Sequence, residues 1–354
     1  MSTAGTPLRF AIIGCGVIGP THAEAIASLP EARLVAVADQ VASRAGALAT
    51  RFQVTAYDSP ERMLEAERPD VVCICTPSGL HGVNACLAMR AGAHVIVEKP
   101  MEITLAAIDE MLRVQEETGR KMAVISQHRF DEASMRVHAL AREGALGRLV
   151  LGNAQVPWWR SQAYYDSGAW RGTWALDGGG VLMNQSIHSI DLLQWLMGPV
   201  KSVQAYTDTL VHQMETEDVA VAILRFANGA LGTIAGTTGA YPGVTTRVEI
   251  FGDQGSAVIA DDHLTYLHLA RDDQEPAGPY GKAAAPPVTN GPTGGAGQAA
   301  LTTATTHAAQ IADMIRAIRE DGTPLLDGVG ARHSVAIILG IYESARVGRE
   351  VGLI

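Results

Sequence analysis

Three consecutive glycines, Gly178 to Gly180, precede a stretch in which Asn184, His188 and Asp191 recur three or four residues apart. Side chains with that spacing share one face of an α-helix, so we expect a helix to follow the flexible glycine entry, with these polar groups projecting together. An imidazole held in this way can take up or release a proton near neutral pH. The alternative is a buried helix whose histidine is simply hydrogen-bonded, and the remaining motifs must decide between the two.

A glycine-rich turn near the start of the sequence has the spacing of a dinucleotide site. The apolar run Leu8 to Ile13 leads into it, and a helical pattern follows from His22 to Leu29. In G-x-G-x-x-G between a strand and a helix, the first glycine makes the tight turn and the second lets a pyrophosphate approach the backbone. The third lets the helix pack on the strand, and the helix N-terminus offers free N–H groups to the phosphates. The turn residues that we assign to cofactor binding are Gly14, Gly16, Val17, Ile18 and Gly19.

An acidic residue stands where such a site needs one. Asp39 follows the second apolar strand, Leu34 to Ala38, and lies about twenty residues after Gly19, where a carboxylate can accept hydrogen bonds from both ribose hydroxyls. The same negative charge repels a 2′-phosphate, so NAD is favoured over NADP as the cofactor. Arg44 lies nearby, and we interpret it as a solvated helix residue rather than as a phosphate ligand.

Apolar strands and helical stretches continue to alternate up to about residue 126, which predicts a doubly wound parallel sheet. In such a sheet the ligand crevice lies at the carboxyl ends of the strands. Lys99 follows the buried strand His94 to Val97, and Pro100 fixes the chain just beyond it, so we assign Lys99 a functional role. The other assigned residues at or just after such strand ends are Thr76, Pro77, His81, Glu98 and Gln127.

These motifs together resemble the glucose-fructose oxidoreductase, inositol dehydrogenase and rhizopine-catabolism family, called Gfo/Idh/MocA. The resemblance implies an N-terminal Rossmann domain that binds NAD, and a C-terminal α+β domain whose mostly antiparallel sheet covers the nicotinamide and forms oligomer contacts. It also implies that Lys99 and His188 are the catalytic pair. The residues that carry it are the Gly14 to Gly19 turn, Asp39, Thr76-Pro77 with His81, Glu98-Lys99-Pro100 and the stretch Gly178 to Asp191.

One residue departs from the family pattern. Many members have aspartate where this chain has Asn184, so a carboxylate that would hold Lys99 and His188 in their charged forms is missing. Beside a cationic nicotinamide, the neutral forms of both side chains become easier to reach, which suits a proton acceptor for alcohol oxidation. We expect Asn184 to orient the substrate hydroxyl or a neighbouring one.

Aromatic and basic residues gather just before and within the glycine-opened stretch. All five tryptophans lie between Trp158 and Trp195. Aromatic rings stack on the apolar face of a pyranose, and arginine binds hydroxyls or anions in a planar, bidentate manner. The segment Met183 to His188, with Arg160 and Tyr164-Tyr165 upstream, is most similar to the subgroup of nucleotide-sugar 3-dehydrogenases and glycoside 3-dehydrogenases. Besides Lys99, Asn184 and His188, the assigned substrate contacts are Arg129, Trp158, Arg160, Tyr164 and Tyr165, while Arg171 is assigned to the cofactor.

Beyond residue 200 the hydrophobic period changes to two, which predicts short antiparallel strands, and Asn228-Gly229 predicts a hairpin. A sheet with one free face offers an oligomer surface, so we expect a homodimer or homotetramer formed through the C-terminal sheet. Residues 272–300 are rich in Gly, Pro and Ala and are expected to form a mobile surface loop. Two helices are expected after it, from Thr303 to Arg319 and from Gly330 to Val347.

Composition narrows the class of protein further. The 354 residues include 27 Lys and Arg against 37 Asp and Glu, a net charge of -10, without a basic run interleaved with aromatics, so nucleic acid is not an expected partner. Apolar runs are too short for a membrane span, so we expect a soluble, cytoplasmic protein. The four cysteines lack zinc-site spacing, and no metal is expected. The length favours two domains, residues 1–126 for the dinucleotide and 127–354 for substrate binding and oligomerisation.

The sequence therefore predicts an NAD-dependent oxidoreductase that moves a hydride between nicotinamide and a secondary ring alcohol. The substrate classes are sugars, glycosides, nucleotide sugars and cyclitols, with C3 as one candidate position. His188 takes the hydroxyl proton while Lys99 polarises the oxygen, or the two roles are exchanged. Two alternatives stay open: a lyase or glycosidase-like enzyme that retains its NAD and uses transient oxidation, and a non-catalytic sensor of sugar or dinucleotide.

Overall fold

The structure is a computed structural model that describes residues 6–272, 278, 281 and 304–353. The chain divides into two compact units, each assembled from separate segments. Unit 1 holds the described residues of Met1–Gln127, Ala175–Gly178 and Thr302–Val335, and unit 2 holds those of His128–Trp174, Gly179–Leu301 and Ala336–Ile354. The expected domain boundary after residue 126 stays a prediction. Most of the loop expected at residues 272–300 lies outside the described residues.

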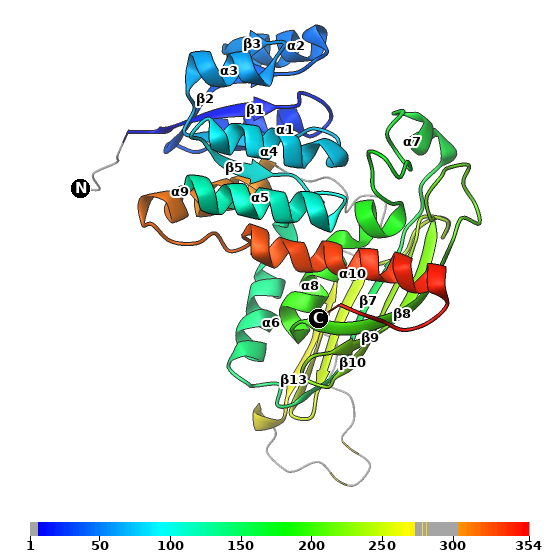
Figure 1. Cartoon of the computed structure of the whole chain (residues 1–354). Coiled ribbons are helices and arrows are strands. Elements are labelled where there is room, and N and C mark those ends of the chain that lie inside the picture. Colours follow the sequence, from blue (N-terminus) through cyan, green and yellow to red (C-terminus); the bar gives the residue numbers. More distant parts are fainter. Residues whose placement is uncertain (1–5, 273–277, 279–280, 282–303, 354) are drawn as a thin grey trace. The chain divides into compact units, whose positions relative to one another are not determined.

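Unit 1 contains a parallel sheet of six strands in the order β3-β2-β1-β4-β5-β6. Strands β4 and β5 lie inside the sheet and are almost entirely buried, because helices cover both faces of the sheet (Figure 1). The predicted doubly wound sheet is confirmed. The strands are β1 Leu8–Ile13, β2 Ala32–Ala38, β3 Thr55–Tyr57, β4 Val71–Ile74, β5 His94–Val97 and β6 Met122–Val124.

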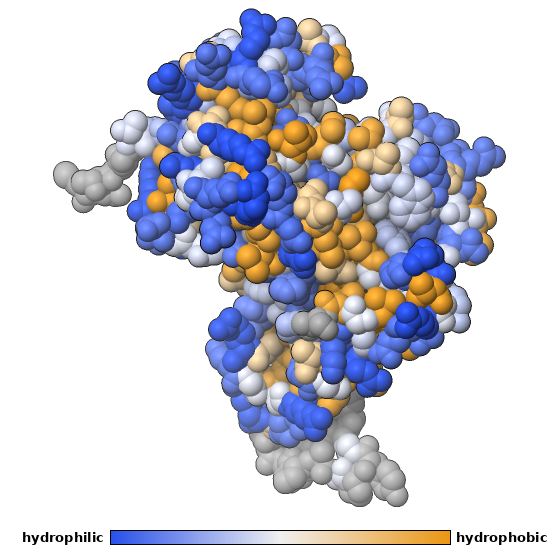
Figure 2. All heavy atoms as spheres, viewed as in Figure 1, coloured by the Kyte–Doolittle hydropathy of each residue, from blue (hydrophilic) through white to orange (hydrophobic). Residues whose placement is uncertain are grey.

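Two helices of unit 1, α3 and α5, begin at residues whose side chains cap them. Ser59 caps α3 by accepting a hydrogen bond from the N–H of Arg62, and Thr104 caps α5 through Ala107. Helix α1 packs against α9, and α4 packs against α5. Hydrophilic residues cover much of the surface seen in Figure 2, with apolar patches between them. The helices are α1 Gly19–Ala27, α2 Ala42–Phe52, α3 Pro60–Glu67, α4 His81–Arg90, α5 Leu105–Thr118 and α9 Ala304–Arg319.

Unit 2 is built on a sheet of eight strands in the order β13-β12-β11-β7-β10-β9-β8-β14. Strands β7 and β10 pair in parallel, and the other neighbouring pairs are antiparallel. The predicted hairpin at Asn228-Gly229 joins β9 to β10, with Gly229 at φ 90°. The predicted mostly antiparallel sheet is therefore confirmed. The strands are β7 Leu149–Pro157, β8 Val200–Asp208, β9 Val219–Phe226, β10 Leu231–Thr237, β11 Arg247–Gly252, β12 Gly255–Ala260, β13 His263–Leu269 and β14 Val351–Gly352.

One face of the second sheet carries helices. Helix α8, Ile187–Met197, packs on β7 and β11, and α6, Glu132–Arg142, packs on α8 and β13. Along β9 buried and exposed residues alternate, so Val221 and Ile223 remain exposed. The short helix α7 is Gln162–Asp166, and α10, Gly328–Val347, contributes residues to both units. Within the described ranges, every helix is too short or too polar to cross a membrane.

Candidate active site

Each glycine of the turn between β1 and α1 has its own steric environment. Gly14 has a φ of +99°, and a Cβ there would lie 2.5 Å from the backbone of Cys75. A Cβ on Gly19 would lie 2.6 Å from the carbonyl oxygen of Gly14. A Cβ on Gly16, in contrast, would meet no described atom within 4 Å, and the next residue, Val17, is 87% exposed. The turn is closely packed at its first and third glycines and open at its second, as a pyrophosphate site requires.

Asp39 lies beside this turn. One carboxylate oxygen accepts a hydrogen bond from the N–H of Cys15 at 2.8 Å, and the other accepts one from the N–H of Val41 at 2.8 Å. Each oxygen keeps a further lone pair for a ribose hydroxyl. Thr76 follows β4, and its buried hydroxyl has no hydrogen-bond partner in the part of the chain that the structure describes. An open glycine, an anchored carboxylate and an unsatisfied hydroxyl fit a bound dinucleotide.

His81 begins α4 and is buried. Its Nδ1 lies 2.7 Å from the carbonyl oxygen of Pro100, and its Nε2 lies 2.9 Å from that of Thr76. The imidazole therefore joins the segment after β4 to the segment after β5, one residue beyond Lys99. This contact gives His81 a bracing role, and its assignment to cofactor binding stays a prediction.

Lys99 follows β5 and is half-buried. The preceding residue, Glu98, is buried, and both of its carboxylate oxygens have hydrogen bonds inside the unit: Oε1 with His22 and His307, and Oε2 with the N–H of Lys99. The carboxylate that we assigned to the cofactor is thus already engaged by protein groups. Gln127, close after β6, is buried as well, and its Oε1 lacks a partner among the described residues.

The second group of predicted residues lies on a helix of unit 2 that begins with a π-helical segment. Residues Val181–Ser186 form this segment, and α8 follows at Ile187, so the expected α-helix begins later and the wider turn carries Asn184. The glycines before it are not a flexible entry. A Cβ on Gly179 would lie 2.1 Å from the hydroxyl of Tyr342, and a Cβ on Gly180 would lie 1.8 Å from the carbonyl oxygen of Glu217. Close packing at these two positions requires glycine.

Glu217 is a functional candidate that the sequence analysis missed. Its buried carboxylate accepts hydrogen bonds of 2.9 Å from the N–H groups of Gly180 and Leu182 and from the hydroxyl of Tyr342. Burial raises the pKa of Glu217 to about 7, although these hydrogen bonds oppose the shift. The side chain satisfies N–H groups that the start of a helix leaves open. A glutamate before an apolar strand was visible in the sequence, but its pairing with the glycines was not.

His188 lines a pocket within unit 2, together with Trp158, Gln185, Thr246 and Asp262 among others. The ring of His128 also lines it and lies edge-on to that of His188, with 5.0 Å between the centroids. Nδ1 of His128 contacts the carboxylates of Asp131 at 3.1 Å and Asp262 at 2.7 Å. Burial favours the neutral ring, but the two carboxylates outweigh it and raise the pKa of His128 to about 10. A cationic imidazole therefore lies against His188 at neutral pH.

Most of the aromatic and arginine residues predicted for ligand binding gather in one cluster of unit 2. The Arg160 guanidinium lies over the rings of Trp158 and Tyr164, at 4.9 and 5.4 Å from their centroids. Arg171 lies 4.4 Å from the Tyr164 ring and donates a hydrogen bond of 2.8 Å to its hydroxyl. The amide of Gln185 donates to the same hydroxyl at 3.3 Å. Gln185, which was not predicted, thus connects this cluster to the pocket beside His188.

Two predicted substrate residues have partners inside unit 2. Arg129 is buried and donates two hydrogen bonds of 2.7 Å to the carboxylate of Asp191. Tyr165 is buried as well, with its hydroxyl 2.7 Å from that of Thr238. These contacts explain both side chains through packing, and their assignment to a ligand stays a prediction. Asp191, expected on one face with His188, is likewise bound to Arg129.

Comparison with protein families and solved structures places the chain among known oxidoreductases. Residues 8–126 match a family model for oxidoreductases with an NAD-binding Rossmann fold, and residues 134–258 match the GFO/IDH/MocA C-terminal domain. The WlbA dehydrogenase from Bordetella pertussis, solved with NADH and UDP-GlcNAcA, is 32% identical with a TM-score of 0.85, over 98% of this chain and 99% of that one. A levoglucosan dehydrogenase solved with NADH is 25% identical with a TM-score of 0.84, over 99% and 100% of the two chains.

Characterised relatives point the same way. D-glucoside 3-dehydrogenase from Escherichia coli (strain K12) is 34% identical over 57% of this chain and 58% of that protein. Myo-inositol 2-dehydrogenase from Thermotoga maritima is 28% identical over 75% of this chain and 79% of that protein. With both halves matched and a relative aligned along nearly its whole length, the chain belongs to the Gfo/Idh/MocA family of NAD(P)-dependent dehydrogenases that act on CH–OH groups.

Proposed function

We propose that this protein transfers a hydride between NAD and a secondary ring alcohol of a sugar, glycoside, nucleotide sugar or cyclitol. The observation that carries the proposal is the pocket of unit 2, where His188 and Trp158 share the lining with the cation of His128. Next to it the Arg160 and Tyr164 stack offers an aromatic face and a guanidinium, the two groups that bind a pyranose and its polar or anionic substituents.

Three side chains, His188, Lys99 and Asn184, have separate roles in the proposed reaction. A bound NAD would supply the acceptor for the hydride of the carbinol carbon. His188 accepts the proton of the substrate hydroxyl, Lys99 polarises the hydroxyl oxygen, and Asn184 orients the same hydroxyl or its neighbour. The exchange of roles between His188 and Lys99 gives the same balanced reaction, in which an alcohol loses a hydride and a proton and becomes a ketone.

NAD is proposed as the preferred cofactor over NADP. The support is Asp39, whose carboxylate is fixed beside the glycine turn by the N–H groups of Cys15 and Val41. A carboxylate at this place accepts hydrogen bonds from ribose hydroxyls and repels a 2′-phosphate. Replacement of Asp39 by Ser is expected to weaken NAD binding and to narrow the ratio of kcat/KM for NAD over NADP.

The carbon oxidised is proposed to be C3 of a pyranoside. The support for C3 comes from the relative named D-glucoside 3-dehydrogenase, at 34% identity. The WlbA dehydrogenase, which holds UDP-GlcNAcA, supports only a nucleotide sugar as one substrate class. The arginines at positions 160 and 171 are compatible with a negatively charged substituent on the sugar. Glycosides and nucleotide sugars are therefore the first substrates to test, before cyclitols.

A homodimer or homotetramer through the sheet of unit 2 is also proposed. Exposed apolar side chains lie on strands β8, β9 and β10, namely Tyr206, Val221, Ile223 and Leu231. Burial of such side chains between two copies would stabilise the oligomer. Ile223→Asp is expected to shift the protein to a smaller assembly in light scattering after size exclusion. An unchanged mass would contradict this surface.

The test of the function is a panel assay with purified protein. The absorbance of the reduced nicotinamide is followed after the protein is mixed with NAD or NADP and with a set of glycosides, UDP-sugars and cyclitols. A denatured sample is checked for retained cofactor. Many turnovers with one substrate class are expected. Tightly retained NADH without net turnover would contradict the proposal and support an enzyme that recycles its own cofactor.

A further inference from the structure

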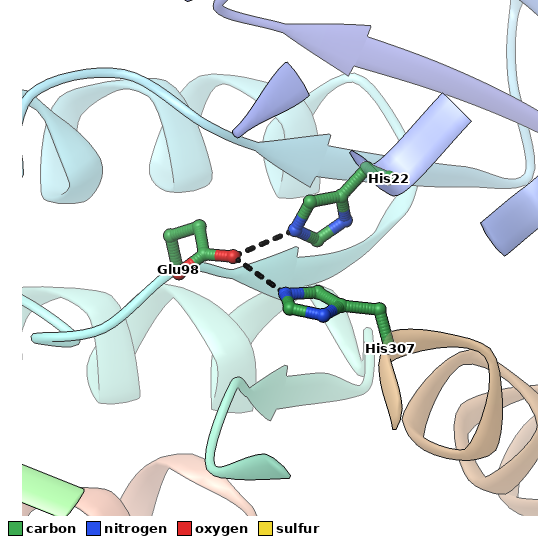
Figure 3. Close-up of side chains that lie close together, drawn as sticks. All are labelled: His22, Glu98 and His307. Atoms are coloured by element: carbon green, nitrogen blue, oxygen red, sulfur yellow. Dashed lines mark hydrogen bonds and ion pairs between the residues drawn. The ribbon is translucent and has the colours of Figure 1, made fainter. Parts of the chain in front are cut away.

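Three buried side chains of unit 1 meet at one oxygen atom. His22 comes from α1, Glu98 follows β5 and His307 comes from α9, and both imidazoles point toward the same carboxylate (Figure 3). Nε2 of His22 lies 2.8 Å and Nε2 of His307 lies 3.2 Å from Oε1 of Glu98. The relative exposures of the three residues are only 0%, 6% and 1%. We call His22, Glu98 and His307 the histidine–glutamate cluster.

The cluster holds a buried negative charge. Burial alone would raise the pKa of Glu98, but the hydrogen bonds from the two imidazoles outweigh it and hold this pKa well below its usual range. Burial lowers the pKa of His22, so this ring is neutral and donates its Nε2–H to the carboxylate. A carboxylate buried in this way must have its oxygens hydrogen-bonded, because an unpaired buried charge is strongly destabilising.

The third hydrogen bond of Glu98 leads to Lys99. Oε2 accepts the backbone N–H of Lys99 at 3.1 Å, so the carboxylate connects α1 and α9 to the residue that carries the proposed catalytic amine. On the far side of Lys99, the carbonyl oxygen of Pro100 is held by His81 at 2.7 Å. The backbone is thus fixed immediately before and immediately after Lys99.

We propose that the histidine–glutamate cluster is a positioning device that fixes the Lys99 backbone relative to α1, the helix that follows the glycine-rich turn. Glu98 acts here through Lys99 and not as a cofactor contact. The proposal rests on the catalytic role given to Lys99 under the proposed function. Its consequence is that loss of the cluster lowers turnover while the glycine turn and Asp39 continue to bind the dinucleotide.

A metal centre is the alternative for the same three side chains. Two imidazoles and a carboxylate suit a divalent cation, and their ligand atoms lie within 4.8 Å of one another. However, a metal-bound histidine normally donates its other ring N–H to an acceptor. Nδ1 of His22 and Nδ1 of His307 have no hydrogen-bond partner among the residues described. This geometry favours hydrogen bonding over metal binding.

The first test replaces the shared acceptor. In Glu98→Gln the side chain keeps its size but its amide nitrogen can only donate, so at least one of the three N–H groups that face it loses its acceptor. We expect kcat to fall roughly 10- to 100-fold, as for a misplaced catalytic group, with the NAD dissociation constant nearly unchanged. The matched control is His94→Gln at the opposite end of β5, where Nδ1 accepts the N–H of Lys121. The control is expected to retain kcat.

A second pair of variants keeps the test decisive if Glu98→Gln does not fold. His307→Leu removes the N–H donor, whereas His307→Gln retains one. Partial rescue of kcat by Gln but not by Leu is expected from positioning, while equal loss in both would overturn it. Hydrogen exchange of the Lys99 amide, measured by NMR without substrate, should be faster in Glu98→Gln and His307→Leu than in the wild type or His94→Gln.

Hydrogen exchange of the Lys99 amide distinguishes failure of the positioning role from failure of the proposed dehydrogenase function. A wild type without dehydrogenase activity would overturn the proposed function, yet protection of the Lys99 amide would still report on the cluster. Unchanged protection and unchanged kcat in Glu98→Gln would overturn the positioning role. A metal centre would replace the positioning role if three results were found together. Each wild-type chain would bind one metal ion, chelation would remove both the ion and the activity, and His307→Leu would bind no ion.

Discussion

Two clusters of histidine and carboxylate lie next to the two proposed catalytic residues, and one imidazole in each has its pKa shifted in the opposite direction to the other. In unit 1, His22 and His307 surround the single carboxylate of Glu98, next to Lys99. In unit 2, the carboxylates of Asp131 and Asp262 surround the single imidazole of His128, next to the His188 ring. Burial lowers the pKa of His22, whereas the carboxylates raise the pKa of His128 to about 10.

The difference comes from the ratio of imidazoles to carboxylates, because burial disfavours the charged form of both His22 and His128. The His22 side chain is fully buried and shares one carboxylate with a second imidazole. The His128 side chain is 21% exposed and has two carboxylates for itself. The same residue types therefore serve two purposes: imidazoles hydrogen-bonded to a carboxylate hold a buried anion in place, and a cation is placed beside a proposed proton acceptor.

The largest effect is expected from the catalytic residues that these clusters support. Lys99→Met should lower turnover by about 10² to 10⁴, the range for lost acid–base help, with NAD affinity nearly unchanged. His188→Gln should fall in the same range, and the double variant should lose less than the product of the two effects, since both act on one hydroxyl. Steady-state rates and NAD titration measure this. Wild-type turnover in Lys99→Met would remove its assignment.

Glu217 is a third buried titratable group, and only hydrogen bonds oppose the effect of burial on its pKa. Its pKa of about 7 lies above the ordinary value of 4.5, so the folded state binds this proton more tightly than the unfolded state. Its contribution to stability is full below about pH 4.5 and falls as the pH rises to 7, by roughly 3 kcal/mol in total.

The variant Glu217→Gln removes this titration. Its free energy of unfolding, relative to that of the wild type, should therefore increase between pH 5 and pH 8. Urea unfolding at several pH values gives the difference between the two proteins. A pH-independent difference would show that burial does not control this carboxyl group, and would place Glu217 with the ordinary paired carboxylates.

The sequence predicted those parts of the fold that depend on neighbouring residues. The glycine turn, the alternation of strands and helices and the hairpin at Asn228-Gly229 each depend on a short stretch of sequence, and the structure confirms them. Strand β13 was missed because its residues, apart from the last, are neither clearly buried nor regularly alternating. Its pairing depends on β12 alone.

The missed parts of the candidate site depend on residues that are distant in the sequence. Glu98 and His307 are 209 residues apart, and Glu217 lies 37 residues from Gly180. The glycines before Asn184 were expected to give a flexible entry, because the sequence does not show that Tyr342 and Glu217 occupy the space of their missing side chains. Individual residue types were therefore recognisable, but their partners were not.

The smallest effect is expected from Asp262→Asn. The pKa of His128 is raised above its ordinary value of 6.5, so its contribution to stability is full below pH 6.5 and is lost as the pH rises through 10. Removal of one carboxylate should lower this pKa and cost about 1 kcal/mol or less at neutral pH, since Asp262 is partly exposed. NMR titration of the imidazole protons should show wild-type His128 titrating near pH 10 and His22 titrating below pH 6.5. Similar pKa values for His128 and His22 would contradict the difference between the two clusters.

Isotope tracing is the most direct test of the proposed hydride transfer. A glycoside or nucleotide sugar found active in the panel is prepared with deuterium on the carbon that becomes the ketone, and the wild type is given excess NAD. We expect deuterated NADH in many equivalents per enzyme chain, together with an equal amount of keto-sugar. Deuterium that stays in or returns to the sugar, without net NADH, would contradict it.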